Sequence, residues 1–219
     1  MFKVSKKLTT ILIIVGCVSS TALFNAAKRN IHENSIADSL NRVKGQVDAP
    51  IKIIEYSDYR CSACAYGSNY IKDLTKEYPD LFRVEIKYYP LNINKYAALS
   101  ARYVECAARQ GKFWDFHYFL FENQKDWKNL SDSQSAFLLV AQELKLDLKE
   151  LEVCVEDEEV LKFLEESKLT GKTLGVTRTP TYFINDKMVV GTVQLKQILE
   201  KLLENYKSKQ ASPKNRKDN

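Results

Sequence analysis

The sequence has little of what marks a disordered, fibrous or nucleic-acid-binding protein. Its 219 residues include only 7 glycines and 5 prolines, and 45% are hydrophobic, with no internal repeat. That composition leaves room for one sizeable domain. The two ends account for more than the whole net charge of +5, because residues 1–17 carry +3 and residues 207–219 carry +4. Residues 18–206 therefore carry −2, so we expect no nucleic-acid partner.

Potential metal ligands are also scarce. The two histidines, His32 and His117, have no evident partner in the sequence, and we assign neither a catalytic role. A zinc site at the pair Cys61 and Cys64 would need two further ligands at suitable spacing, and the next two cysteines are 48 residues apart in no pair motif. We therefore expect neither a metal nor a cofactor.

The N-terminus has the pattern of an export signal. Three lysines in the first seven residues precede an apolar run, residues 11–18. The tetrapeptide that ends at Cys17 resembles a bacterial lipobox, which would make Cys17 a lipidation site, whereas residues 20–22 would suit ordinary signal peptidase. Residues 8–24 could instead remain as an anchor at the lower limit of bilayer-spanning length. All three alternatives for residues 1–24 predict an exported protein, periplasmic or otherwise extracytoplasmic and in one case membrane-anchored.

The remaining pattern predicts a strand-rich core interrupted by helices. After a polar linker over residues 25–44, a domain is expected over 45–206, and a basic disordered tail over 207–219. The β-branched, apolar run 51–57 predicts a buried central strand. The other predicted elements are a helix over 62–78, a strand over 81–89, helices only from about 94 to 174, a hairpin over 181–190 and a helix over 195–206. Within the helical part, a capping box over 131–134 predicts one helix start. This order predicts an α/β core with an inserted all-helical subdomain.

The chemistry is expected at Cys61-Ser62-Ala63-Cys64, directly after the strand and at the start of a helix. Unpaired amides at a helix N-terminus stabilise a thiolate, and the first cysteine gains most. Cys61 is thus the predicted nucleophile, and Cys64, one turn into the helix, is the buried partner that closes a disulfide with it.

Two further features adjoin this motif. Glu55 lies in the apolar strand, where it is either a buried proton acceptor for Cys64 or a strand-end carboxylate that faces solvent. Thr179-Pro180 precedes the hairpin, and Pro180 would either form a cis bond that exposes backbone for a substrate or be an ordinary trans proline at a strand start.

Five cysteines are an odd number for an exported protein. Cys106 and Cys154 both have apolar neighbours in predicted helices of the insert, so each should face its interior. We therefore predict a structural disulfide between them, the alternative being two buried free thiols. This pairing leaves Cys17 alone, as lipidation or signal cleavage requires.

Together these motifs resemble the DsbA-like disulfide oxidoreductases, a branch of the thioredoxin fold with an inserted helical domain. The resemblance covers about residues 45–205 and rests on residues 53–64, on 110–114 and on 175–184. It implies that Pro180 is a cis-proline facing the active site, that Thr179 contacts thiols and substrate, and that Glu55 is the buried acid. It also implies unfolded or reduced exported proteins as substrates and a membrane quinone-linked partner for reoxidation.

The residues between the cysteines depart from the family pattern. Ser62-Ala63 replaces the Pro-His of the best-known oxidases, which removes a positive charge that would stabilise the Cys61 thiolate. We expect a disulfide-forming oxidase, with an exported reductase or isomerase as the first alternative. The second alternative is a lipid-anchored chaperone or binding module in which the CxxC is structural.

Overall fold

Two segments of the chain, residues 42–91 and 95–211, are described by the computed structural model. The predicted signal over residues 1–24, with the lipidation candidate Cys17, lies outside the described residues. So do nearly all of the predicted linker and residues 212–219 of the predicted tail.

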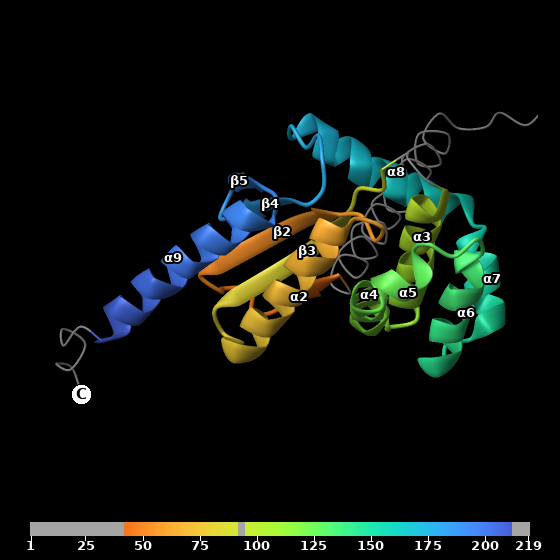
Figure 1. Ribbon diagram of the computed structural model, residues 1–219, viewed down its shortest axis with the longest axis horizontal. Helices are drawn as coiled ribbons and strands as arrows, with labels where there is room; N and C mark the ends of the chain where they lie inside the picture. The colour runs from red at the N-terminus through yellow and green to blue at the C-terminus, as the bar shows by residue number, and fades with distance from the viewer. Residues whose placement is uncertain (1–41, 92–94, 212–219) are drawn as a thin grey trace, which may run out of the picture. The chain divides into compact units, whose positions relative to one another are not determined.

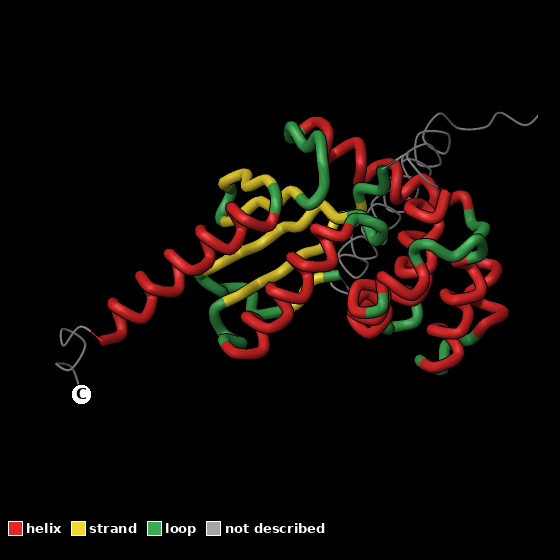
Figure 2. The backbone as a smooth tube through the Cα atoms, in the orientation of Figure 1, coloured by secondary structure: helices red, strands yellow, loops and turns green. Residues whose placement is uncertain are grey.

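A five-stranded mixed sheet forms the core (Figures 1 and 2). Its strand order is β1-β3-β2-β4-β5, in which β2 is parallel to β3 and every other neighbouring pair is antiparallel. The bounds are Val43–Lys44 for β1, Ile51–Ser57 for β2, Phe82–Tyr88 for β3, Thr181–Ile184 for β4 and Lys187–Val190 for β5. The apolar run 51–57 is thus the central strand, as its composition predicts.

One face of the sheet is covered by two helices in contact with each other, α2 (Ser62–Glu77) and α9 (Thr192–Ala211), which Figure 1 draws in front of the strands. Buried side chains from both helices and from four strands join one apolar cluster, among them Ile53, Ile71, Val84, Ile184 and Leu199. Because α2 begins five residues after β2 ends, the sheet and this core fix the start of α2 near the carboxyl end of β2.

Helices alone link β3 to β4 among the described residues. They are α3 (Lys95–Arg109), α4 (Phe113–Glu122), α5 (Gln124–Trp127), α6 (Ser133–Glu143), α7 (Leu148–Val155) and α8 (Glu158–Thr173). The helix α8 leads back to the sheet, where the Ser167 hydroxyl donates to the Tyr88 carbonyl at 2.9 Å. The α/β architecture with an all-helical insertion, predicted over about 94–174, is confirmed.

The domain is longer than the sequence pattern suggests at both ends. At the start, Val43 and Lys44 pair with β3, and the Arg42 guanidinium lies 2.7 Å from the Glu105 carboxylate. The predicted linker therefore ends before Arg42, because backbone pairing and a buried ion pair hold these polar residues. At the other end α9 continues through residues 207–211 of the predicted tail, since nothing in Lys207 to Gln210 breaks a helix.

The predicted cap of α6 is displaced by one residue. The N-cap is Asp132, whose carboxylate accepts from the backbone amides of Gln134 and Ser135, while the Ser131 carbonyl accepts from the Tyr96 hydroxyl. A carboxylate at the cap offers a charged acceptor to two amides at once, so Asp132 displaces Ser131 from this position.

Candidate active site

Cys61 is the N-cap residue of the helix α2. Its sulfur accepts from the Cys64 backbone amide at 3.4 Å and lies 3.6 Å from the Thr179 carbonyl oxygen. The Cys61 side chain is half-buried, whereas Cys64 is fully buried, and neither thiol is in a disulfide. The pair is therefore asymmetric, with one sulfur accessible and the other enclosed.

The environment separates the two thiols further. A hydrogen bond from the Cys64 thiol is the largest cause that lowers the pKa of Cys61 from 9.0 to about 6, and backbone amides of the first helical turn contribute in the same direction. Burial raises the pKa of Cys64 well above its ordinary value. At neutral pH Cys61 is therefore mostly a thiolate, and Cys64 keeps its proton.

Glu55 lies beneath this pair, inside the central strand. It is fully buried, and one carboxylate oxygen accepts from the Ser57 hydroxyl at 2.8 Å. The other oxygen, Oε2, has no hydrogen-bond partner among the described residues. Burial raises the Glu55 pKa from 4.5 to about 8, so the carboxyl is largely protonated at neutral pH. The solvent-facing alternative for Glu55 is wrong.

The loop before β4 faces the same sulfur. The peptide bond between Thr179 and Pro180 is cis, and the Thr179 carbonyl is the group that lies beside Cys61. The Thr179 hydroxyl is buried, and its hydrogen bond also lowers the Cys61 pKa. The structure therefore brings Cys61, Cys64, Thr179 and Pro180 to one place, with Glu55 below them.

A glutamine from the insert also holds the motif, and the sequence pattern did not single it out. The Gln124 amide nitrogen donates to the carbonyl of Tyr59 at 2.7 Å and to that of Cys61 at 3.0 Å. Nearby, the Lys128 ammonium donates to the Ser62 hydroxyl at 2.6 Å. Gln124 stands at the end of an aromatic helical segment, where the sequence gave no signal that its side chain donates to these carbonyls. The two carbonyls lie more than 60 residues earlier in the chain.

His117 has no evident partner in the sequence, but the structure buries it between two hydroxyl groups. The Tyr59 hydroxyl lies 2.9 Å from its Nδ1, and the Ser68 hydroxyl of α2 lies 2.9 Å from its Nε2. Burial lowers the His117 pKa from 6.5 to about 3, so the ring is neutral. His117 thus fastens the redox helix to α4 and does not titrate near neutral pH.

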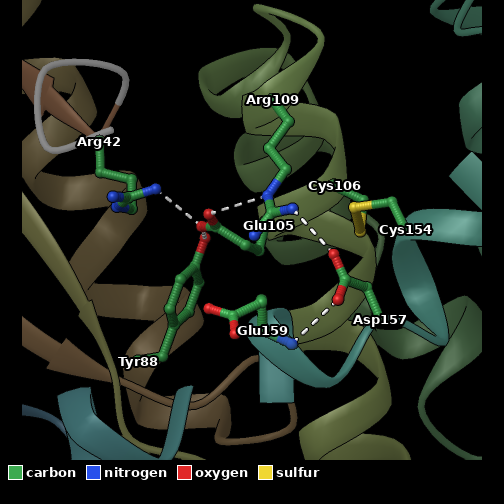
Figure 3. A network of polar contacts seen from close by, with 8 residues as sticks. All are labelled: Arg42, Tyr88, Glu105, Cys106, Arg109, Cys154, Asp157 and Glu159. Carbon is green, nitrogen blue, oxygen red and sulfur yellow. Dashed lines mark hydrogen bonds and ion pairs between the residues drawn. A yellow bond between two sulfur atoms is a disulfide. The ribbon is translucent and has the colours of Figure 1, made fainter. Parts of the chain in front are cut away.

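Cys106 of α3 and Cys154 of α7 form a disulfide, with Cα atoms 5.8 Å apart (Figure 3). Beside it Glu105 is buried and accepts from Arg42 and from the Tyr88 hydroxyl. Figure 3 shows the same cluster continuing through Arg109, whose guanidinium lies 3.2 Å from the Asp157 carboxylate. The bridge and these ion pairs tie the insert together and join it to the sheet.

Within residues 42–91 and 95–211, no group of histidine, cysteine, aspartate and glutamate side chains could hold a metal ion. No helix in these same ranges is long and apolar enough to cross a bilayer.

Comparisons with known proteins agree with this geometry. A family model described as Thioredoxin matches residues 38–205. The Na(+)/H(+) antiporter NhaA 3 of Salinispora tropica is 25% identical over 174 residues, which cover 79% of this chain and 26% of that protein. The chain thus spans about a quarter of the length of the curated relatives it matches.

Two solved structures share the fold. α-DsbA1 of Wolbachia pipientis has a TM-score of 0.65 at 22% identity, with 76% of this chain and 91% of that chain covered. BdbD of Bacillus subtilis has a TM-score of 0.63 at 24% identity, with 74% and 92% covered. The chain belongs to the thioredoxin family, and its fold matches that of DsbA-like thiol-disulfide oxidoreductases.

Proposed function

We propose that this protein is a thiol-disulfide oxidoreductase that forms disulfides in exported proteins through Cys61 and Cys64. The observation that carries the proposal is the asymmetry of the pair. Cys61 is accessible with a pKa lowered to about 6, whereas Cys64 is enclosed with a raised pKa. A sulfur with a low pKa is a good leaving group, which is what release of an oxidised product requires. Membership of the thioredoxin family supports the same chemistry.

In the proposed cycle, the oxidised enzyme carries a Cys61–Cys64 disulfide. A substrate thiolate attacks Cys61, forms a mixed disulfide and expels Cys64, which takes a proton from the protonated carboxyl of Glu55. A second substrate thiolate then attacks the substrate sulfur of the mixed disulfide, and Cys61 leaves as a stable thiolate. The substrate loses two electrons and gains a disulfide, while the enzyme is left with both cysteines reduced.

Thr179 and Pro180 are the proposed substrate-binding residues. Support comes from the Thr179 carbonyl, 3.6 Å from the Cys61 sulfur, and from the Thr179 hydroxyl, which is buried beside that sulfur. An extended substrate segment beside this loop would bring its cysteine to Cys61. Pro180 has no backbone N–H and leaves that position of the loop free for a substrate.

We place the reaction outside the cytosol, with a membrane quinone-linked protein as the partner that reoxidises Cys61 and Cys64. The Cys106–Cys154 disulfide supports an oxidising compartment. The substrates proposed are unfolded or reduced exported proteins. Retention at the membrane through residues 1–24, by lipid on Cys17 or as an anchor, belongs to the same proposal.

A reductase or isomerase is the second candidate, favoured by one observation. The residues between the cysteines, Ser62 and Ala63, bring no positive charge, and the groups that lower the Cys61 pKa are neutral hydrogen-bond donors. A thiolate stabilised only in this way makes a less strongly oxidising disulfide than one beside a cation.

The test is oxidation of a reduced, unfolded model protein by the oxidised enzyme. The Cys61→Ser variant should lose all activity, whereas the neighbouring Ser62→Ala variant should keep it. Activity retained after Cys61→Ser would favour the chaperone or binding module instead. Equilibration of the wild type with glutathione buffers then separates the directions, because an oxidase holds its disulfide less tightly than a reductase.

A further inference from the structure

A tyrosine hydroxyl is buried beside the redox pair and takes no part in the cycle above. Tyr182 lies in β4 directly opposite Glu55 of β2, and directly paired residues project from the same face of a sheet. The residue is fully buried, and its hydroxyl has no hydrogen-bond partner among the described residues. A buried hydroxyl without a partner costs stability, so phenylalanine would be the more stabilising residue here.

The redox helix leaves room for this hydroxyl at Gly67. A Cβ atom at Gly67 would lie 2.0 Å from the Tyr182 oxygen, which no side chain could tolerate. The backbone of Gly67 is not in the left-handed region, so its conformation does not require glycine. Glycine inside a helix destabilises the helix relative to alanine. Gly67 of α2 and Tyr182 of β4 each cost stability, and the Tyr182 hydroxyl oxygen accounts for both residues.

The hydroxyl end of Tyr182 lies close to a hollow at the surface. Thr192 Cγ2 is 3.3 Å from the position of that same Cβ, so the Tyr182 hydroxyl and Thr192 are neighbours at the start of α9. Thr192 lines a hollow of about 370 Å³ between α2 and α9, together with Tyr66 and Val193. Thr192 therefore lies both beside the hydroxyl and in the wall of this hollow.

The Tyr182 side chain also lies near the groups that exchange protons. Glu55 Oε2 is also buried without a partner in the described chain. Burial raises the Tyr182 pKa, and the charges of Glu55, Cys64 and Cys61 raise it further, which shows that the phenol lies within their field. Tyr182 therefore stays a neutral O–H group, able to accept one proton and donate another.

We propose that Tyr182 is a positioning residue that carries protons between Glu55 and the hollow between α2 and α9. The proposal rests on the proposed function, since Glu55 must exchange a proton with Cys64 in every cycle. Before Cys64 attacks a mixed disulfide, the protonated Glu55 gives its proton, directly or through a water molecule, to the Tyr182 oxygen, and Tyr182 releases its own proton to water in the hollow. The Glu55 carboxylate then takes the Cys64 proton as the sulfur attacks. Glu55 and Tyr182 thus end in the protonation states in which they began.

The test measures release of glutathione from a mixed disulfide on Cys61, by rapid mixing, in Tyr182→Phe. The matched control is Tyr56→Phe, which removes a hydroxyl from a buried ring of the neighbouring strand on the opposite face of the sheet. We expect Tyr182→Phe to slow release at least about tenfold, which is less than the roughly 10²- to 10⁴-fold of direct general acid–base catalysis because Glu55 stays in place. Tyr56→Phe should match the wild type, and the reduction potential should not change in either variant.

Two additional measurements separate proton transfer from packing. Imidazole, a small proton carrier that the hollow could admit, should accelerate release in Tyr182→Phe and leave the wild type unaffected. Gly67→Ala should destabilise the protein by displacing the Tyr182 oxygen, and the double variant Gly67→Ala/Tyr182→Phe should recover stability while release stays slow.

The outcomes distinguish the two proposals. Release at the wild-type rate in Tyr182→Phe, or in the double variant, would overturn the proton route and leave the oxidoreductase proposal intact. Slow release that imidazole does not accelerate would also overturn it. If the wild type forms no mixed disulfide on Cys61 or never releases glutathione, it is the proposed function itself that fails.

Discussion

Replacement of Glu55 by glutamine should make the protein more stable at neutral pH. The carboxyl is fully buried with a pKa of about 8, and an unfolded chain would have the ordinary 4.5. Below pH 4.5 the group is neutral in both states and contributes nothing. Between pH 4.5 and 8 the unfolded state loses the proton and the folded state keeps it, so stability falls as pH rises. Above pH 8 the loss is complete.

The magnitude follows from the size of the shift. Each pKa unit corresponds to about 1.4 kcal/mol, so the wild type should lose about 3 kcal/mol between pH 4.5 and 7 and about 5 kcal/mol by pH 8. Glutamine has nearly the same shape, and its amide can still accept from the Ser57 hydroxyl. The Glu55→Gln variant should therefore lack this loss.

Urea unfolding at several pH values measures the difference. The oxidised protein is used, because the Cys106–Cys154 bridge then stays intact during the assay. The Glu55 pKa shift is expected there too, since burial is its largest cause. The difference in unfolding free energy between Glu55→Gln and wild type should grow from pH 4.5 to 8 and then level. A constant difference across that range would refute the assignment of Glu55 as a buried, protonated acid.

Three other changes have expected outcomes. Ala63→His should lower the Cys61 pKa further and make the disulfide more oxidising in glutathione buffers, because a cation would lie beside the thiolate; an unchanged potential would argue against this. Gln124→Ala should cost about 1–3 kcal/mol in urea unfolding, since the Tyr59 carbonyl loses a buried donor and the Cys61 carbonyl loses one of two donors, and a cost below about 0.5 kcal/mol would make Gln124 dispensable. Replacing Cys106 and Cys154 together by alanine should cost on the order of 4 kcal/mol for a loop of this length, and unchanged thermal stability would deny the bridge a structural role.

Local patterns were enough to predict the elements that position the motif. The run 51–57 alternates little and is β-branched, and it forms the central strand Ile51–Ser57 with those bounds. Within the stretch predicted to hold helices only, Lys95–Arg109 ends where Gln110-Gly111 follows, as a glycine after a helix indicates. The segment 113–121 is aromatic because its side chains pack: Phe113, Phe116 and Phe121 are buried.

Contacts between distant segments could not be predicted from those patterns. Gln124 reaches the Cys61 carbonyl across 63 residues, and His117 reaches Tyr59 across 58. Nothing local distinguishes a buried glutamine that caps carbonyls from one on a helix surface. The relation of Gly67 to Tyr182 was hidden for the same reason, since neither residue is unusual until the register of β2 with β4 is known.

The pH dependence of Cys61 alkylation is the most direct test of whether Cys61 is the accessible thiolate of the pair. The reduced protein is treated briefly with iodoacetamide across a pH series, and the modified cysteines are identified by peptide mapping. We expect modification at Cys61 with a midpoint near pH 6, while Cys64 stays unmodified in the folded protein. A midpoint at or above the value of about 8.5 for a free thiol, or modification of Cys64 before Cys61, would contradict it.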